Sequence, residues 1–214
     1  MNTYFISDMH IGHERCINFD NRPFANVEEM DNLMHFYWNE KIKNDDVVYI
    51  LGDISLKVNE DIIKFVSTLK GHKILVKGNH DKLQDHRYKI LFDDIVNYAE
   101  IKVGVKNPDN STNTLNLVLS HYPILMWKNQ HRGHIHLYGH VHNSPEETIY
   151  RESLQRLIES KNIDDDSPHH RTPLKLTNNY LAYNVGAMMP YMNYTPRTLD
   201  EIIKYGNKYY KQGE

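Results

Sequence analysis

The sequence has little cysteine and no strong excess of either charge. A single cysteine, Cys16, stands among its 214 residues, so no disulfide forms within the chain and a zinc module built on Cys-x-x-Cys pairs is excluded. The 25 lysines and arginines nearly balance 28 aspartates and glutamates, which gives a formal net charge of -3. This balance argues against nucleic-acid binding through bulk electrostatics. The lone cysteine fits a reducing compartment, so we expect a cytoplasmic protein.

Long apolar segments are also missing. No stretch approaches the ~18 consecutive apolar residues of a transmembrane helix, and the opening MNTYFISDMH lacks the basic start of a signal peptide. We therefore expect no membrane partner. Hydrophobic residues still make up 40% of the chain and charged residues 25%, which are proportions typical of a folded globular protein. The length of 214 residues fits one domain with a substantial core.

Histidine, by contrast, is abundant. The chain has 14 histidines against 8 methionines and 6 phenylalanines. Imidazole is the commonest metal ligand in proteins and the usual acid or base near neutral pH. The places where these histidines fall along the predicted strands and helices therefore indicate where chemistry could occur.

Apolar patterns predict alternating strands and helices in the first half of the chain. Apolar runs at 3–7, 47–51 and 73–77 predict three strands. Asn26 and Asn59 are predicted N-caps of two helices, because apolar residues recur behind each of them at spacings of three and four. Two strand–helix–strand units of this kind favour an α/β layered fold.

The second half is predicted to be richer in strands. Segments 95–105 and 115–119 flank a turn-rich connector at 106–110 and predict a hairpin, and segments 135–138 and 180–185 predict further strands. We interpret residues 145–179 as an insertion, opened by a helix over 146–160, within a single domain that spans 1–214. A capping box at Thr198–Glu201 predicts a final helix.

Metal-capable side chains follow five of the predicted strands. These strand ends are Asp8-Met9-His10, Gly52-Asp53, Gly78-Asn79-His80-Asp81, Ser120-His121 and Gly139-His140-Val141-His142. Open α/β sheets place their ligands at the carboxyl ends of the strands, so we expect these side chains to meet. The glycines are predicted to allow sharp turns before the ligand residues. Each motif taken singly is also compatible with an ordinary turn.

The types of these side chains indicate two metal ions. Aspartate, asparagine and histidine without thiolate suit divalent ions such as Mn²⁺, Fe²⁺, Zn²⁺ or Ni²⁺, whereas Ca²⁺ would need more oxygen ligands. A carboxylate such as Asp53 can bridge two ions ~3.5–4 Å apart, the separation that suits phosphoryl displacement.

The ordered set D-x-H, G-D, G-N-H-D, H and G-H-x-H resembles the calcineurin-like metallophosphoesterase superfamily. The resemblance covers residues 3–143 together with Asn184-Val185-Gly186. It implies a four-layer α/β/β/α sandwich of two mixed sheets flanked by helices. Asn184 is expected to support the site through hydrogen bonds.

The resemblance also implies a role for each matching residue. Two sets of four residues would each hold one metal ion, Mn²⁺ by preference: Asp8, His10, Asp53 and His142, and Asp53, Asn79, His121 and His140. A hydroxide between the ions would be the nucleophile. His80 would protonate the leaving oxygen or steady the developing charge, and Asp81 would orient His80.

Two further residues are candidates for contact with substrate. His13 lies three residues after His10 and is expected near the metal site. Arg22 lies in the loop after the first motif, where its guanidinium could bind a phosphate; a surface salt bridge explains it equally well.

The predicted function is metal-dependent hydrolysis of phosphodiester or phosphomonoester bonds in a small, nucleotide-like substrate. Diesters are favoured because His80 suits poor leaving groups. One alternative is a non-catalytic metal-binding interaction module on the same fold, which would be expected to lack ligands or the acid histidine. Another is a nuclease, which would be expected to carry a basic face. The oligomeric state is open.

Overall fold

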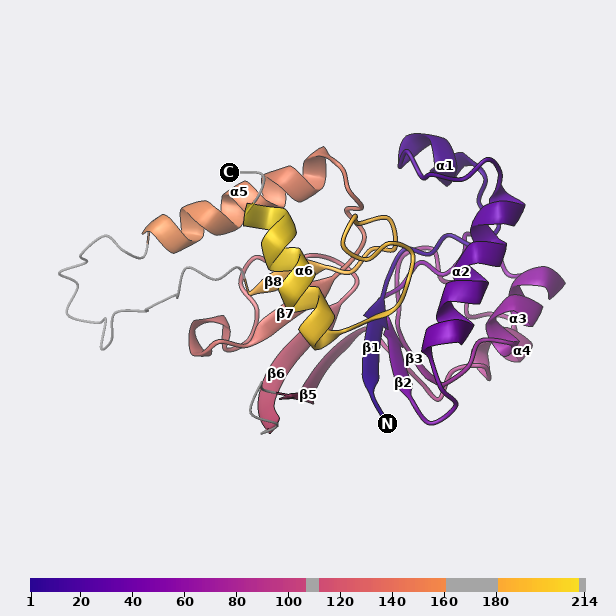
Figure 1. The fold of residues 1–214 in the computed structure, drawn as a ribbon, viewed down its shortest axis with the longest axis horizontal. Helices are drawn as coiled ribbons and strands as arrows, with labels where there is room; N and C mark the ends of the chain where they lie inside the picture. The colour runs from indigo at the N-terminus through magenta and orange to yellow at the C-terminus, as the bar shows by residue number, and fades with distance from the viewer. Residues whose placement is uncertain (107–111, 161–180, 212–214) are drawn as a thin grey trace.

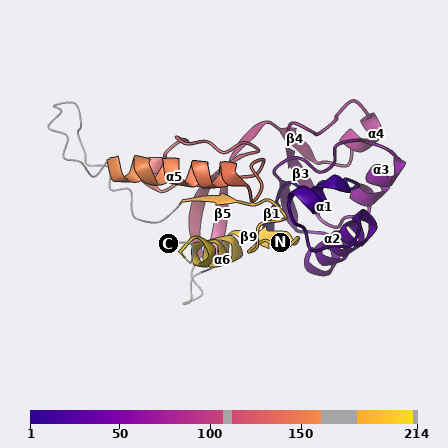
Figure 2. The same ribbon diagram turned by 90° about the horizontal axis from the view of Figure 1, so that it is seen from above.

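The computed structural model describes residues 1–106, 112–160 and 181–211. They form a mixed α/β fold in which two mixed sheets lie side by side and each has helices beside it (Figures 1 and 2). The α/β class expected from the sequence is confirmed. Among these described residues, no helix is long and apolar enough to cross a membrane.

The first sheet contains the strands of the first half of the chain. Its order is β4-β3-β2-β1-β9, with β1 (Thr3–Ile6), β2 (Val47–Ile50), β3 (His72–Val76), β4 (Asp94–Val96) and β9 (Arg197–Thr198). The first four strands run parallel and β9 is antiparallel to β1. Four helices lie on this side of the molecule (Figure 1): α1 (Arg15–Phe19), α2 (Val27–Lys41), α3 (Glu60–Ser67) and α4 (His86–Lys89).

The second sheet has the order β5-β6-β7-β8. Its strands are β5 (Tyr98–Lys106), β6 (Thr112–Ser120), β7 (Ile135–Tyr138) and β8 (Ala182–Asn184). The β5–β6 pair is antiparallel, which confirms the predicted hairpin, and the other pairs are parallel. A short 3₁₀ helix (Gln130–Arg132) precedes β7, and α5 (Pro145–Ser160) and α6 (Leu199–Lys211) lie beside this sheet (Figure 2).

The segment predicted as one strand over 95–105 is divided in the structure. The chain leaves the first sheet at Asn97, so β4 pairs with β3 while β5 pairs with β6. A continuous β-prone run favours extended backbone but does not specify its partner, and this explains why the sequence pattern missed the crossing. Most of the predicted connector, residues 107–110, lies outside the described residues.

The predicted helix caps are confirmed. Asn26 accepts a hydrogen bond from the Glu29 backbone N–H at 2.8 Å, and Asn59 accepts one from Ile62 at 3.0 Å. At the last helix, the backbone N–H of Thr198 donates to the Glu201 carboxylate at 2.8 Å. Each cap satisfies N–H groups that a helix leaves without a partner in its first turn.

Helix α5 packs against the second sheet and forms a hydrophobic cluster with it. Its Tyr150, Leu154 and Ile158 are buried and pack with Val118 and Tyr138 of the second sheet. The helix expected at the start of the 145–179 segment is therefore present and covers a sheet face. The remaining residues of that segment, 161–179, lie outside the described part of the chain, as does Tyr180 of the predicted last strand.

The two sheets meet where β1 ends. Ser7 forms an isolated parallel bridge with Gly186, two residues after β8. The Ser7 N–H donates to the Val185 carbonyl at 2.9 Å, and the Ala187 N–H donates to the Ser7 carbonyl at 2.8 Å. Helix α6 also contacts strands of both sheets. The strand ends that carry the predicted ligands therefore come together at the junction of the sheets.

His136 on β7 should make folding stability depend on pH. It is completely buried; its Nδ1 bonds the Val118 carbonyl at 3.0 Å, and its Nε2 accepts from the Ile124 N–H at 3.1 Å. Burial lowers the pKa of His136 to about 4. In the unfolded chain His136 takes up a proton near its ordinary pKa of about 6.5, whereas in the folded chain it does so only near pH 4. Its contribution to folding stability is therefore present above about pH 6.5 and is lost as the pH drops towards 4.

When the pH is lowered from 7 to 5, protonation of His136 in the unfolded chain is expected to reduce the free energy of unfolding by about 2 kcal/mol. Urea unfolding at both pH values measures this loss, and a His136→Gln variant should lose correspondingly less stability between them. The matched control is His131→Gln, because His131 is exposed. An equal pH dependence in the wild type and His136→Gln would contradict this account.

Candidate metal centre

Five of the seven predicted ligands have left-handed backbone. The φ angles are +52° at Asp8, +54° at His10, +55° at Asp53, +69° at His140 and +51° at His142. Residues other than glycine rarely adopt this region, and such residues cluster at functional sites. The two turns after β1 and β2 are held together, because the Asp8 N–H donates to the Gly52 carbonyl at 3.0 Å and the His10 N–H to the Asp53 carbonyl at 3.1 Å.

The first cluster consists of Asp8, His10 and His142. Their ligand atoms lie within 4.8 Å of one another. The Nε2 atoms of His10 and His142 are 3.1 Å apart, and His142 Nε2 is 3.6 Å from Asp8 Oδ1. Asp8 Oδ2 accepts from the Ser7 hydroxyl at 2.6 Å and from the His140 N–H at 3.0 Å, so Oδ1 is the oxygen that remains directed at the cluster.

Asp20 sets the orientation of His142. Its Oδ1 lies 2.7 Å from His142 Nδ1. A carboxylate can only accept, so Nδ1 carries a proton, and in the neutral form of the ring the lone pair of Nε2 points towards His10. Burial opposes a charge on His142, but Asp20 and Asp8 outweigh it and raise its pKa. A carboxylate behind a histidine is the usual support of a metal-binding imidazole.

The second cluster consists of Asp53, His121 and His140, again with ligand atoms within 4.8 Å of one another. His121 Nδ1 donates to the Leu51 carbonyl at 2.8 Å, which leaves Nε2 facing Asp53 Oδ2 at 3.5 Å. The same Nε2 lies 2.9 Å from Asn79 Oδ1, so Asn79 joins this cluster. The structure thus brings together all four residues predicted to hold the second ion, Asp53 among them. Bridging by Asp53 to the first cluster stays a prediction.

Electrostatics in the second cluster fit a bound cation. Burial lowers the pKa of His121, but Asp53 outweighs it and raises the pKa to about 9. Burial raises the pKa of Asp53, but His121 outweighs it and lowers the pKa to about 2. A proton on His121 Nε2 therefore faces two acceptors, Asp53 Oδ2 and Asn79 Oδ1. A divalent ion displaces such a proton when it binds.

The donor set passes a further test for metal. Asp8 Oδ1, the oxygen directed at the first cluster, is buried without a hydrogen-bond partner among the described residues. Buried polar atoms without partners are rare in native proteins and need an explanation. Imidazole nitrogens with carboxylate and amide oxygens suit borderline divalent ions. The two buried clusters could therefore hold metal ions.

Comparisons with known proteins find relatives of this chain among phage proteins. No protein-family model matches it. The gene 66 protein of Mycobacterium phage L5 is 32% identical over 164 residues, which cover 66% of this chain and 78% of the phage protein. The chain belongs to the gene 66 protein family. The gene 66 protein of Mycobacterium phage D29 is 29% identical over 160 residues, covering 66% of this chain and 79% of its own length.

Two further similarities extend beyond phages. The uncharacterized protein MJ1445 of Methanocaldococcus jannaschii is 36% identical over 111 residues, which span 50% of this chain and 60% of that relative. Among solved structures, the protein of unknown function AQ665 from Aquifex aeolicus matches with a TM-score of 0.53 and 22% identity. That match covers 94% of this chain and 97% of the other, and at this identity it concerns the fold alone.

His80 lies at the rim of the two clusters. Its side chain is 43% exposed, and its Nε2 is 3.9 Å from Asp53 Oδ2. Its ring centroid is 5.9 Å from that of His10. Asn79 is also exposed, so this turn forms the solvent side of the site. A molecule approaching the clusters from solvent would meet the imidazole of His80.

The contacts of Asp81 differ from the expected orientation of His80. Its buried carboxylate accepts from the backbone N–H groups of Gly78 at 2.8 Å, Asp53 at 3.0 Å and Ile54 at 3.2 Å. These bonds tie the turn after β3 to the turn after β2. We therefore correct the sequence expectation: Asp81 holds the backbone that carries Asp53 and His80 and has no hydrogen bond to the His80 ring among those of the described residues.

Arg22 is not available to a substrate phosphate. Its side chain is fully buried and forms an ion pair with Asp20 at 2.8 Å. Its two terminal nitrogens also donate to the carbonyls of Asp8 at 3.0 Å and Met9 at 2.9 Å. Of the two sequence interpretations, the phosphate contact is wrong, and the salt bridge is present but buried instead of lying at the surface. Because the loop folds back beneath the first motif, Arg22 supports both the Asp8 turn and Asp20 behind His142.

His13 lies beside the first cluster, as expected. Its ring centroid is 5.7 Å from that of His10 and 5.7 Å from that of Phe19. Burial and the nearby Arg22 lower its pKa, which favours a neutral ring. His13 is not grouped with either set of ligands, and its contact with substrate stays a prediction.

The glycines act mainly by leaving space. Gly52 has a φ of +87°, which confirms the predicted sharp turn. At Gly78 and Gly139 the backbone is not left-handed; instead a Cβ would collide with Asp53 at the first and with Ser7 and Asp8 at the second. The glycines therefore allow one motif to approach the carboxylate of another.

Sequence reasoning missed Asp20. An acidic residue two positions before Arg22, in the loop after D-x-H, was the available indication, but its partner His142 lies 122 residues away. Asn184, in contrast, was expected to support the site, and its Nδ2 donates to the His142 carbonyl at 2.8 Å. The same Nδ2 lies 3.1 Å from Glu147, which links the ligand loop to helix α5.

Proposed function

We propose that this chain is a calcineurin-like metallophosphoesterase that hydrolyses phosphodiester bonds in small, nucleotide-like substrates. The observation that carries the proposal is the convergence of two His/Asp clusters at one sheet junction. The two mixed sheets with helices beside each support the finer four-layer α/β/β/α arrangement (Figure 2). Monoesters are a secondary substrate class in this proposal.

The clusters divide the work of metal binding. Asp8, His10 and His142 would hold one ion, and Asn79, His121 and His140 the other, with Asp53 between them. We propose Mn²⁺ as the metal, with Fe²⁺, Zn²⁺ and Ni²⁺ as the other ions that suit these ligands. When bound, two such ions supply Lewis-acid activation of water and neutralise charge on the phosphate.

His80 is proposed to act on the leaving group. Its half-exposed ring stands beside Asp53 at the solvent side, where a bound phosphate would meet it. A sugar alkoxide leaves poorly unless it is protonated, and an imidazole is a side chain suited to that proton transfer. Asp81 contributes by fixing the backbone between Asp53 and His80. The single buried Cys16 fits a reducing compartment, so we propose a cytoplasmic location.

Two diesters with different leaving groups test this proposal. Wild-type protein with Mn²⁺ should hydrolyse bis-p-nitrophenyl phosphate and the dinucleoside monophosphate ApA, and EDTA should abolish both activities. The His80→Ala variant is expected to lose about 10²–10⁴-fold on ApA, because general acid catalysis contributes that much, and far less on the nitrophenyl ester, whose leaving group needs no proton.

The matched control is His131→Ala, an exposed histidine of the 3₁₀ helix that should leave both rates unchanged. Absence of turnover with Mn²⁺, Fe²⁺, Zn²⁺ and Ni²⁺, despite bound metal, would replace the hydrolase with the non-catalytic metal-binding module. Equal losses on both esters in His80→Ala would refute the leaving-group role.

A further inference from the structure

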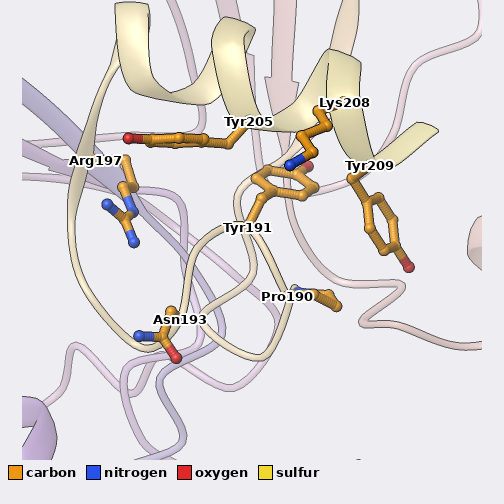
Figure 3. A pocket seen from close by; sticks show the side chains of 7 residues that line it. All are labelled: Pro190, Tyr191, Asn193, Arg197, Tyr205, Lys208 and Tyr209. Atoms are coloured by element: carbon orange, nitrogen blue, oxygen red, sulfur yellow. The ribbon is translucent and has the colours of Figure 1, made fainter. Parts of the chain in front are cut away.

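A concave site lies between α6 and the segment that runs from the loop after β8 into β9. Its volume is about 420 Å³, within the range of small-molecule pockets. Figure 3 shows side chains of α6 facing those of the loop across it. The pocket is lined by seven residues: Pro190, Tyr191, Asn193, Arg197, Tyr205, Lys208 and Tyr209. None of the predicted metal ligands is among them.

The lining combines aromatic rings with positive charge. Three of the seven residues are tyrosines, two are cations, and none carries a carboxylate; Arg197 pairs with Glu201, outside the lining, at 3.5 Å, and Lys208 is exposed. Tyr205 is 40% exposed, so part of its ring is open to solvent beside the Arg197 and Lys204 cations, which lie 5.5 and 5.3 Å from the ring centre. Tyrosine rings stack on nucleobases, whereas lysine and arginine bind phosphate. The lining therefore has the chemistry of a site for an aromatic anion.

The loop side of the pocket is held in a fixed shape. Arg197 Nε donates to the Met192 carbonyl at 3.3 Å, and its guanidinium carbon lies 5.5 Å from the centre of the Tyr205 ring. Asn193 and Tyr194 are consecutive residues with left-handed backbone, at φ +49° and +55°. Strained backbone of this kind persists only where surrounding structure holds it, and it is found at ligand clamps.

Hydrogen bonds connect the pocket wall with the metal-ligand loop. The Tyr209 hydroxyl donates to Asn143 Oδ1 at 3.2 Å, and Asn143 directly follows the predicted ligand His142. The Tyr191 hydroxyl donates to the carbonyl of Asn184, whose side chain in turn donates to the His142 carbonyl at 2.8 Å. The pocket is thus separate from the clusters in its lining but adjoins their supporting residues.

We propose that this pocket binds a nucleoside monophosphate, independently of the metal ions. The base stacks on Tyr205, and the phosphate pairs with Lys208 at the side of the pocket that Arg197 also lines. The cavity volume suits one nucleotide rather than a folded partner. This binding does not depend on the proposed hydrolase activity, because no metal ligand contributes to it.

Calorimetric titration of AMP into the full chain tests the proposal, once with Mn²⁺ and once with EDTA. AMP is expected to bind the pocket under both conditions, and adenosine without its phosphate should bind more weakly. Lys208→Gln should weaken AMP binding about tenfold through loss of a charge-assisted contact. Tyr205→Leu should weaken AMP and adenosine alike, through loss of the stacking ring.

Lys211→Gln is the matched control, because Lys211 is an exposed lysine of the same helix that does not line the pocket. It should bind AMP as the wild type does. Three outcomes would overturn the proposal: no AMP binding in the presence of EDTA, equal AMP affinity in Lys208→Gln and Lys211→Gln, or equal affinity of the wild type for adenosine and AMP. The first would still leave the hydrolase proposal open to its own assay.

Discussion

Replacing Asp53 with asparagine is expected to lower Mn²⁺-dependent hydrolysis of bis-p-nitrophenyl phosphate about a thousandfold. The Asp53 carboxylate has a pKa of about 2 and lies 3.5 Å from His121 Nε2, so it is charged at every working pH. Lewis-acid catalysis contributes several kcal/mol, and each 1.4 kcal/mol is about a factor of ten in rate. Losing the charge between the two clusters should remove most of that contribution.

The backbone N–H of His80 donates to Asp53 Oδ1 at 2.9 Å. Asparagine has the same shape as aspartate and retains an oxygen that can accept this bond. The fold should therefore survive, and circular dichroism checks that it does. Asp45→Asn is the matched control, since Asp45 is exposed in the turn before β2. A rate in Asp53→Asn equal to that of Asp45→Asn would eliminate Asp53 from the site.

Replacing Arg22 with glutamine is expected to destabilise the fold by about 3–5 kcal/mol, the usual result of breaking a buried ion pair by removing one partner. The change leaves the buried Asp20 carboxylate without its cation, and the carbonyls of Asp8 and Met9 lose the hydrogen bonds that Arg22 donates to them. Because Asp20 orients His142, the affinity for metal should also fall, by about tenfold or more. Urea unfolding and Mn²⁺ titration measure the two effects.

The control Arg15→Gln changes an exposed arginine of α1 and should alter neither quantity. The same experiment distinguishes the structural role from the phosphate contact that the sequence suggested. If Arg22 bound the substrate phosphate, the Arg22→Gln variant would have a raised KM but wild-type stability and metal affinity. That result would contradict the buried arrangement.

The metal clusters could be predicted from the sequence because parallel strands share an edge. Once runs such as 47–51 and 73–77 are assigned as neighbouring strands, the residues that follow them must meet, whatever the loops do. Asp53 and Asn79 lie together for this reason, and His121 joins them from the second sheet.

Other features depend on contacts that no local pattern contains. His142, the partner of Asp20, lies 122 residues further along the chain. The burial of the Arg22 side chain depends on how its loop folds back towards the end of β1. Burial of a charged side chain is unusual enough that an exposed role was the natural expectation. The break at Asn97 likewise follows from which sheet each strand joins, because both halves are equally β-prone.

Titration of Mn²⁺ into the metal-free chain by isothermal calorimetry tests the central claim most directly. The account predicts two ions per chain, with one retained in His10→Ala and one in His140→Ala, because each variant removes a ligand from one cluster. A wild-type stoichiometry of one or zero, or two ions in both variants, would contradict a dinuclear centre built from these residues.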